Sequence, residues 1–124
     1  MAPQKPEVDP IDGPVPTDLE ITDITVGDGP EAAAGNRVAV HYVGVAHSTG
    51  EEFDASYNRG QPLQFGLGVG QVIQGWDQGV QGMKVGGRRR LVIPPHLGYG
   101  DRGAGGAIKP GETLIFVVDL LQVG

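Results

Sequence analysis

The aromatic residues are the side chains of this sequence whose placement could support chemistry. The 124 residues include one tryptophan, three tyrosines and three phenylalanines, and some of them adjoin loop-like sequence at Phe53-Asp54 and in LGYG at residues 97–100. Aromatic residues usually fill a core, and periodicity alone favours that interpretation. Loops also carry binding sites, so the same residues could line an apolar pocket. The pattern of residues leaves both interpretations open.

Other kinds of catalytic site find little support. The chain has no cysteine, which excludes disulfides, zinc–thiolate sites, iron–sulfur clusters and thiol nucleophiles. No serine stands in a GxSxG nucleophile elbow, and Ser48 and Ser56 fall in polar sequence typical of loops. The three histidines have neither i, i+4 spacing on a plausible helix nor a carboxylate cluster beside them: His41, His47 and His96. We therefore expect neither a metal ion nor ordinary nucleophilic catalysis.

Cofactors and nucleic acids are also unexpected. The segment GLGVGQ at residues 66–71 has Gln71 in place of the third glycine of a dinucleotide fingerprint, and no GxxxxGK[ST] phosphate loop occurs. The formal net charge of −6 opposes binding to nucleic acid or to an anionic membrane, since both require a basic surface. The one basic run is Arg88 to Arg90. A strand would divide it between two faces, and we expect it at an exposed, solvated edge.

Hydropathy and the N-terminal sequence suggest a location and a domain boundary. No stretch reaches the roughly 18 apolar residues of a membrane span, and MAPQKPEVDP lacks the apolar run of a signal peptide. We therefore expect a cytoplasmic protein with no membrane partner. Residues 1–17 carry five of the ten prolines and almost no apolar side chains, which predicts a flexible, acidic, proline-rich tail. Residues 18–124 are predicted to form one domain.

Four segments are predicted to be strands. Residues 19–27 alternate apolar and polar side chains before the turn signal GDGP, and in residues 37–46 only one face looks committed to a core. Residues 88–94 end at two prolines, and residues 113–123 are apolar on both faces, as in a central strand. Because few of these runs are separated by a two-residue turn, we expect long crossing connections.

One helix is predicted between the second and third strands. The spacing of one helix face recurs within residues 72–83, at Ile73, Trp76, Val80 and Met83. The same segment contains three glycines, each costing about 1 kcal/mol relative to alanine in a helix, so this helix must be held by docking on the sheet. Several strands with one short amphipathic helix predict an α+β domain, an antiparallel sheet wrapped over a single helix.

Four strings of residues are similar to those of one known family. The chain resembles the FKBP-type peptidyl-prolyl cis-trans isomerases in strings that follow the family's order at fitting separations: VHYVG at 40–44, FDASYNR at 53–59, VIQGWDQGVQGMKVGGRRRLVIPPHLGYG at 72–100 and TLIFVVDLL at 113–121. The resemblance extends over about residues 18–123. It implies a twisted antiparallel β-sheet wrapped around one short α-helix, in a protein that is usually monomeric.

The resemblance also implies roles for individual residues. Trp76 resembles the tryptophan at the floor of the family's pocket, Tyr99 the rim tyrosine whose hydroxyl bonds a bound carbonyl, and the Ile73 N–H the other donor to ligands. The residues implied to be catalytic are Asp54, Tyr99, Trp76, Phe116 and Tyr42. Those implied to bind substrate are Phe53, Arg59, Leu63, Phe65, Gln71, Val72, Ile73 and Ile108.

Asp54 resembles the pocket carboxylate, with Arg59 and Tyr42 as its supporting partners. Its carboxylate could face the twisting carbonyl, or it could be a structural anchor neutralised by these partners, and both interpretations stay open. The sequence departs from well-known family members where it has Ala104 for a loop histidine, Ala107 for an isoleucine and Leu63 for a wall phenylalanine. We therefore expect less contact area at the rim and an altered affinity for large macrocycles.

On this resemblance the chain is expected to rotate X–Pro bonds in an apolar aromatic pocket and to assist protein folding. The expected partners are proline-containing peptides, unfolded proteins and macrolides of the rapamycin class. One alternative is a binding module that holds proline peptides or macrolides without catalysis, and another is a structural domain whose aromatic rings form a sealed core. A further hypothesis is that Val15-Pro16 of the tail visits the pocket.

Overall fold

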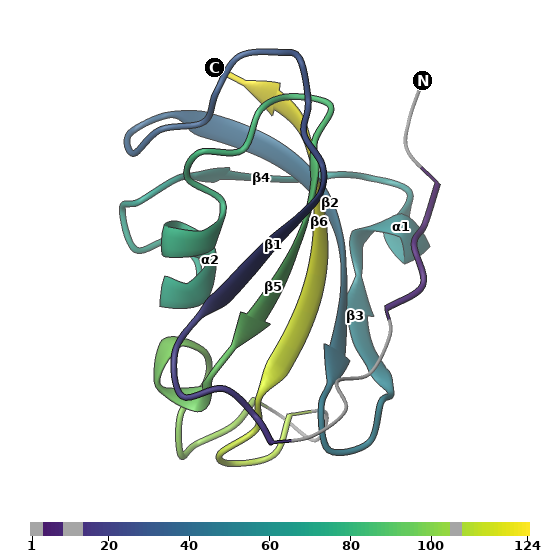
Figure 1. Cartoon of the computed structure of the whole chain (residues 1–124), viewed down its shortest axis with the longest axis vertical. Helices are drawn as coiled ribbons and strands as arrows, with labels where there is room; N and C mark the ends of the chain where they lie inside the picture. Colours follow the sequence, from purple (N-terminus) through teal and green to yellow (C-terminus); the bar gives the residue numbers. More distant parts are fainter. Residues whose placement is uncertain (1–3, 9–13, 105–107) are drawn as a thin grey trace.

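One antiparallel sheet organises the chain, as seen in a computed structural model that describes residues 4–8, 14–104 and 108–124 (Figure 1). The strands are β1 (Glu20–Thr25), β2 (Arg37–Ala46), β3 (Glu52–Ala55), β4 (Leu63–Gly66), β5 (Arg88–Ile93) and β6 (Leu114–Val123). Their order in the sheet is β1-β5-β6-β2-β3, and β4 pairs with the first half of β2, whereas β3 pairs with its second half. The helices are α1 (Ser56–Arg59), α2 (Gln74–Gly79) and a 3-10 turn, η1 (Pro95–Leu97). The predicted α+β fold is confirmed.

The two longest strands, β2 and β6, lie side by side in the middle of the sheet. β6 also pairs with β5, so the prediction of a central strand at residues 113–123 is confirmed. The prediction that only one face of residues 37–46 is committed to a core is wrong, because nine of the ten residues of β2 are buried. On the outer face, the ring of His41 stacks on Tyr57 of α1 at 4.4 Å, which removes that side chain from water.

The prediction that the run Arg88 to Arg90 lies at an exposed, solvated edge is wrong. The run begins β5, which lies between β1 and β6. The Arg89 side chain is 11% exposed, and its Nε donates to Asp23 of β1 at 2.6 Å. Its Nη1 donates to the carbonyls of Gly79 and Gln81 at 2.9 Å each. Arg89 therefore joins the edge strand to the end of α2, and its charge is used inside the molecule.

The helix α2 docks on β5 through its glycines. An added Cβ at Gly75 would lie 2.6 Å from the Ile93 side chain, and one at Gly79 would lie 2.7 Å from Leu91. These glycines lower helix propensity but allow this close approach, which is the docking that the sequence required. The helix is shorter than the predicted 72–83, since the chain turns after Gly79.

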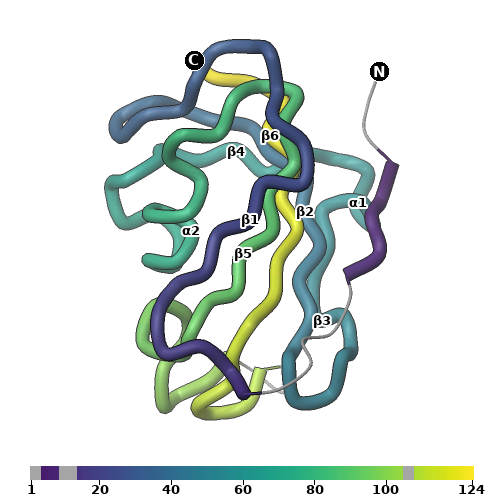
Figure 2. Tube along the Cα trace, viewed as in Figure 1, coloured from purple at the N-terminus to yellow at the C-terminus, as the bar shows by residue number. Residues whose placement is uncertain are grey.

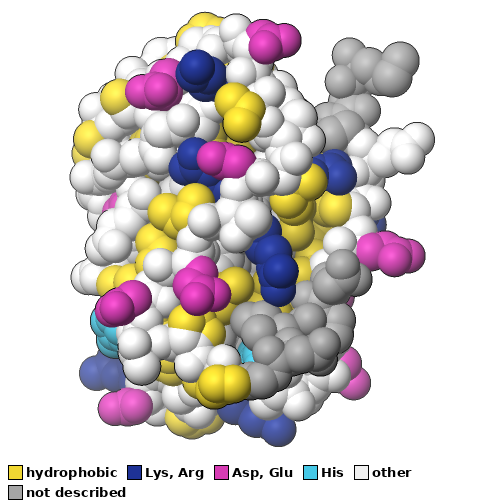
Figure 3. Space-filling model, in the orientation of Figure 1, with side chains coloured by type: hydrophobic (Ala, Val, Ile, Leu, Met, Phe, Trp, Pro, Cys, Tyr) yellow, Lys and Arg dark blue, Asp and Glu magenta, His cyan; other side chains and the backbone are white. Residues whose placement is uncertain are grey.

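Exposed apolar side chains lie on β1 and just after it, and within the described residues this strand pairs only with β5. All six of its residues are exposed, so the predicted alternation provides no buried face here. Figure 3 shows hydrophobic side chains at the surface on this side of the molecule, and Ile21, Ile24 and Val26 are among the exposed residues. No helix in the described part of the chain is long and apolar enough to cross a membrane.

The described part of the N-terminal segment, residues 4–8, runs beside α1 (Figure 2). Lys5 Nζ lies 2.9 Å from a carboxylate oxygen of Glu52 and donates to the Asn58 side chain at 3.0 Å. Arg88 Nη2 donates to the Gln4 carbonyl at 2.8 Å. The predicted flexibility of residues 1–17 stays a prediction, and residues 1–3 and 9–13 lie outside the described part of the chain.

Candidate active site

A cavity of about 420 Å³ opens between α2 and the inner face of the sheet. Residues from widely separated parts of the chain line it: Tyr42, Phe53, Asp54, Leu63, Gly70, Gln71, Val72, Ile73, Trp76, Tyr99 and Phe116. Such a volume falls within the range of small-molecule sites, about 300–1,000 Å³. Tyr42, Trp76 and Phe116 are therefore neither pure core nor pure surface, because they belong to the hydrophobic core and also border the cavity.

Trp76 lies at the centre of the aromatic residues. Its indole is edge-on to Phe116 at 5.2 Å and to Tyr42 at 4.8 Å between ring centroids. Phe53 meets Phe116 edge-to-face at 5.4 Å. Edge contacts of this kind stabilise each pair by about 0.5–1.5 kcal/mol beyond area burial. Trp76 is only 4% exposed, but it lines the cavity and is not sealed beneath other side chains.

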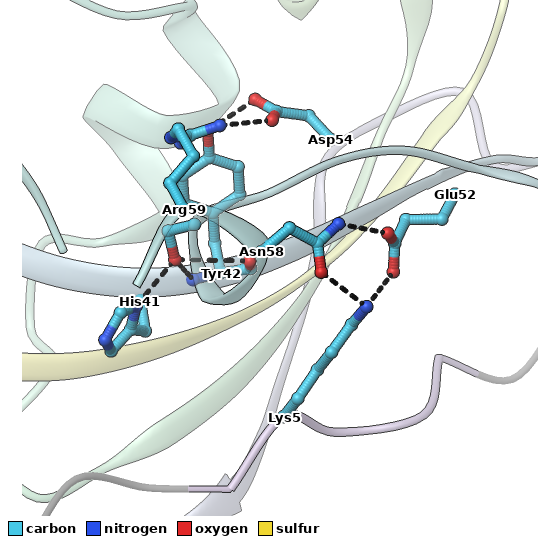
Figure 4. A network of polar contacts seen from close by, with 8 residues as sticks. Lys5, His41, Tyr42, Glu52, Asp54, Asn58 and Arg59 are labelled. Atoms are coloured by element: carbon cyan, nitrogen blue, oxygen red, sulfur yellow. Dashed lines mark hydrogen bonds and ion pairs between the residues drawn. The ribbon is translucent and has the colours of Figure 1, made fainter. Parts of the chain in front are cut away.

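Two polar residues, Tyr42 and Asp54, form one side of this apolar cavity, and Figure 4 shows their contacts with Arg59. The Tyr42 hydroxyl donates to Oδ2 of Asp54, while Arg59 Nη1 donates to Oδ1 at 2.7 Å and Arg59 Nη2 to the Tyr42 hydroxyl at 2.8 Å. Burial raises the pKa of Asp54, but the hydrogen bonds from Tyr42 and Arg59 outweigh it, so the pKa lies below its usual value. Asp54 is therefore an ionised carboxylate at neutral pH, and both of its oxygens have partners.

The one-turn helix α1 connects this group with the rest of the fold. Each of its residues makes a side-chain contact: Ser56 Oγ accepts from the Tyr42 N–H at 2.7 Å, the Tyr57 hydroxyl donates to Asp119, Asn58 donates to Glu52 at 2.9 Å, and Arg59 binds Asp54. Ser56 is fully buried. The prediction that it lies in a polar loop is wrong, and its contact with His41 Nδ1 at 2.8 Å is structural, because a buried hydroxyl cannot reach a substrate.

The Tyr99 hydroxyl and the Ile73 N–H, both at the cavity, have no partner among the described residues, and the buried Trp76 Nε1 is a third such donor. Tyr99 lies just after η1 and is 39% exposed, and its hydroxyl makes no hydrogen bond with the described chain. The N–H of Ile73, the N-cap residue of α2, is also without a hydrogen bond in that part of the chain. Both groups are free to bond a ligand that enters the cavity.

The loop between β4 and α2 forms another wall, and it is shaped by one carboxylate. Asp77 of α2 accepts hydrogen bonds from the N–H groups of Gly68 at 2.8 Å and Gly70 at 3.0 Å. Gln71 Oε1 accepts from the Gly66 N–H at 2.8 Å. Sequence reasoning did not identify Gly70 as a lining residue or Asp77 as its support. The one available signal was the glycine-rich run at residues 66–71, which had been considered only as a nucleotide motif.

The cavity brings together most of the residues that the resemblance selects. All five that were implied to be catalytic line it, as do Phe53, Leu63, Gln71, Val72 and Ile73. Three others lie outside the lining: Phe65 is buried in the core against Trp76, Ile108 is buried in the same cluster, and Arg59 lies behind Asp54. Ala104 packs against the core, whereas Ala107 lies outside the described residues. Neither Val15 nor Pro16 lines the cavity.

Comparison with known proteins settles the family. The sequence model described as "FKBP-type peptidyl-prolyl cis-trans isomerase" matches residues 29–121, which is most of the chain. The chain belongs to this FKBP family. Its members are peptidyl-prolyl cis-trans isomerases, and the resemblance drawn from the sequence is confirmed.

Two bacterial relatives of this FKBP match it over nearly their whole length. An "FK506-binding protein" of Streptomyces anulatus is 73% identical over 124 residues, covering 99% of this chain and all of the relative. A "Probable FK506-binding protein" of Corynebacterium glutamicum is 52% identical over 119 residues, covering 96% of this chain and 98% of the relative. Among solved structures, the crystal structure of AtFKBP13 superposes with a TM-score of 0.80 at 45% identity, covering 89% of this chain and 96% of that one.

The stability of this FKBP should fall as the pH rises above about 10. Burial raises the pKa of three tyrosines above the usual 10.0 in the folded chain: Tyr42, Tyr57 and Tyr99. Their protonated forms therefore stabilise the folded state fully below that pH, and the contribution is lost as the pH rises through their folded pKa values. Tyr57→Phe should reduce the proton dependence of unfolding above pH 10 by up to about one proton. Urea unfolding between about pH 8 and about pH 11 measures the free energy of unfolding of the wild type and of Tyr57→Phe. Equal slopes of this free energy against pH for the two proteins would contradict the prediction.

Proposed function

We propose that the cavity over Trp76 is where this FKBP binds prolyl segments and rotates their X–Pro bonds, and that it thereby assists protein folding. The observation that carries the proposal is an open apolar cavity with aromatic walls, bordered by the Tyr99 hydroxyl and the Ile73 N–H, which have no partner among the described residues. Proline rings are apolar and the peptide groups beside them are polar. The cavity therefore offers each part of a prolyl segment a matching surface.

The chemistry requires neither a nucleophile nor a proton transfer. Rotation about an amide bond has a barrier of about 18–20 kcal/mol, because the planar form is stabilised by resonance. At the twisted midpoint this resonance is lost, so the carbonyl carries less negative charge than in either planar form. An apolar site that excludes water disfavours the polar planar forms more than the midpoint, and so it lowers the barrier.

In this proposal each side of the cavity has a separate task. Trp76 and Phe116 form the seat for the proline ring, and the Tyr99 hydroxyl with the Ile73 N–H fixes the flanking backbone. Because Tyr42 and Arg59 already occupy both oxygens of Asp54, the structure favours the anchor role for this carboxylate. In that role it holds the Tyr42 ring at the wall and leaves the twisting carbonyl to the apolar surface.

Macrolides of the rapamycin class are proposed to occupy the same cavity. Two bacterial relatives are named for binding FK506, and the volume and apolar lining of this cavity are those of a small-molecule site, which could hold part of such a ligand. Leu63 at the wall provides less aromatic contact than a phenylalanine would. The monomeric state and the cytoplasmic location remain predictions from the sequence.

An isomerisation assay on an X–Pro peptide should show faster cis–trans relaxation with the protein, and a rapamycin-class competitor should abolish the acceleration. The alternative function, a non-catalytic binding module, predicts that the protein binds the peptide without accelerating it. The relaxation time of the peptide would then stay at the uncatalysed value, tens to hundreds of seconds. Trp76 is the only tryptophan, so ligand entry can be followed by its fluorescence. A rate that stays uncatalysed while fluorescence reports binding would contradict the proposal.

A further inference from the structure

Glu112 is a buried carboxylate that joins two segments far apart in the sequence. It is 7% exposed and precedes β6. Its Oε2 accepts from the Ser48 backbone N–H at 3.1 Å, and its Oε1 accepts from the Ser48 hydroxyl. Beside it, the His47 N–H donates to the Thr113 carbonyl at 3.0 Å. The turn after β2 is thus fixed to the segment that leads into β6.

Ser48 belongs to the turn that sets the position of β3. In this turn the Ala46 N–H donates to the Glu51 carbonyl at 3.0 Å. β3 follows immediately, and two of its residues, Phe53 and Asp54, line the cavity. A displacement of the turn would therefore displace one wall of the cavity.

Glu112 itself stands at the end of the segment that carries the opposite rim. The two ends of the segment that follows Tyr99 are joined where the Gly111 N–H donates to the Gly100 carbonyl at 2.9 Å. This segment, DRGAGGAIKPG at residues 101–111, is rich in glycine. Glycine loses more conformational freedom on ordering than any other residue, so such a segment needs strong contacts at its ends.

A carboxylate suits this task better than a neutral side chain. Burying a charge is costly unless it is well hydrogen-bonded, and the hydrogen bonds of an ionised acceptor are about twice as strong as neutral ones. Among the described residues, the side-chain oxygens of Glu112 accept only from Ser48. Two bonds to one residue fix orientation as well as distance. The charge is therefore committed to this single connection.

We propose that Glu112 is a positioning residue for the isomerase, one that holds the rim at Tyr99 at the correct separation from the wall at Phe53 and Asp54. This inference rests on the function proposed above. Tyr99 contacts the backbone that flanks the proline, and it makes the same contact in the planar and the twisted forms. Loss of the connection therefore weakens binding of both forms equally, which raises KM and leaves kcat nearly unchanged.

The test compares kcat and KM for an X–Pro peptide in the full chain and its variants. Glu112→Ala should raise KM about 5- to 20-fold and change kcat less than about twofold, because only a fraction of molecules keeps the competent rim. Glu112→Gln, which retains an acceptor for Ser48, should recover most of the loss. Ser48→Ala removes one of the two donors and should lie between wild type and Glu112→Ala. Glu51→Ala, in the same turn, is the matched control, and its KM should equal that of the wild type.

Hydrogen exchange provides the second measurement. In Glu112→Ala the amides of Ala104, Ile108 and Gly111 should exchange faster, while those in β5 and β6 keep their wild-type rates. An unchanged KM in Glu112→Ala, or a loss confined to the melting temperature, overturns the inference. If that variant does not fold, Ser48→Ala decides by the same KM criterion, with Glu112→Gln as the control whose KM should stay near the wild-type value. A wild-type protein without isomerase activity would instead overturn the proposed function and not this contact, which the exchange rates report separately.

Discussion

Replacing Asp119 with leucine should lower the free energy of unfolding by about 3 kcal/mol. The Asp119 side chain is 6% exposed and accepts from Arg88 Nε at 2.7 Å, while the Tyr57 hydroxyl donates to its other oxygen. The Arg88 side chain is 25% exposed, so the leucine would leave a largely buried guanidinium without its carboxylate partner, with only the Gln4 carbonyl to bond in the described part of the chain. Removing one member of such a pair costs about 3–5 kcal/mol, and the partial exposure of Arg88 places the effect at the lower end.

The control removes the whole polar group. In the triple variant Arg88→Met, Tyr57→Phe, Asp119→Leu, no charge or hydroxyl is left without a partner, and most of the lost stability should return. Urea denaturation of the three proteins measures the free energies. If Asp119→Leu alone is as stable as the wild type, the network does not support the outer face of the sheet. A triple variant less stable than the single one would show that the cost arises from packing.

The elements that could be predicted from the sequence are those whose signal is local. Residues 113–123 are apolar on both faces, and β6 is indeed central because such a strand must be covered on both sides. Trp76, Val80 and Met83 of the predicted helix face are buried, although Val80 and Met83 lie beyond the end of α2. By contrast, β3, β4 and α1 have four residues each, which is too short for a period of 2 or 3.6 to be recognised.

The errors arise where the partner of a residue lies far along the chain. Arg89 is bonded to Asp23, 66 residues away, and Arg88 to Asp119, 31 residues away. No local pattern shows that a basic run will be neutralised by acidic residues of neighbouring strands, so a solvated edge was the natural expectation. The same holds for Ser48 and Glu112, which lie 64 residues apart.

The candidate site depended on the resemblance to the family more than on any pattern. Tyr42, Phe53, Trp76 and Phe116 come from four different elements, and their types alone are equally compatible with a core. The structure explains this ambiguity. Tyr42, Trp76 and Phe116 are at most 5% exposed and belong to the hydrophobic cluster, yet they also line the cavity. One set of rings serves both the fold and the site.

Gly44 shows how closely this double use constrains the backbone. It lies on β2, where it faces Asp54 on one side and Phe116 on the other. A Cβ at this position would lie 2.6 Å from Phe53 Cζ and 2.6 Å from Phe116 Cε1. Each ring would have to move by roughly 1 Å to reach an ordinary contact distance of about 3.5–4.0 Å. The two rings that would move are walls of the cavity.

Gly44→Ala should therefore lower isomerase activity about 100-fold, since a displacement of about 1 Å in a binding site can cost that much. It should also destabilise the fold by about 1–3 kcal/mol through overpacking. The direction is informative, because Gly44 does not have a positive φ. At such a position alanine ordinarily stabilises a protein by about 0.4–1 kcal/mol through the unfolded state.

A second substitution tests the cause. Phe53→Leu in the Gly44→Ala background removes one of the two clashing rings, so the double variant should be more stable than the sum of the two single effects predicts. Peptide isomerisation and urea unfolding on all four proteins complete the cycle. If Gly44→Ala is active and more stable than the wild type, the rings can yield without loss, and the cavity walls are softer than their edge-to-face packing implies. Strict additivity of the two substitutions would place the damage of Gly44→Ala somewhere other than at Phe53.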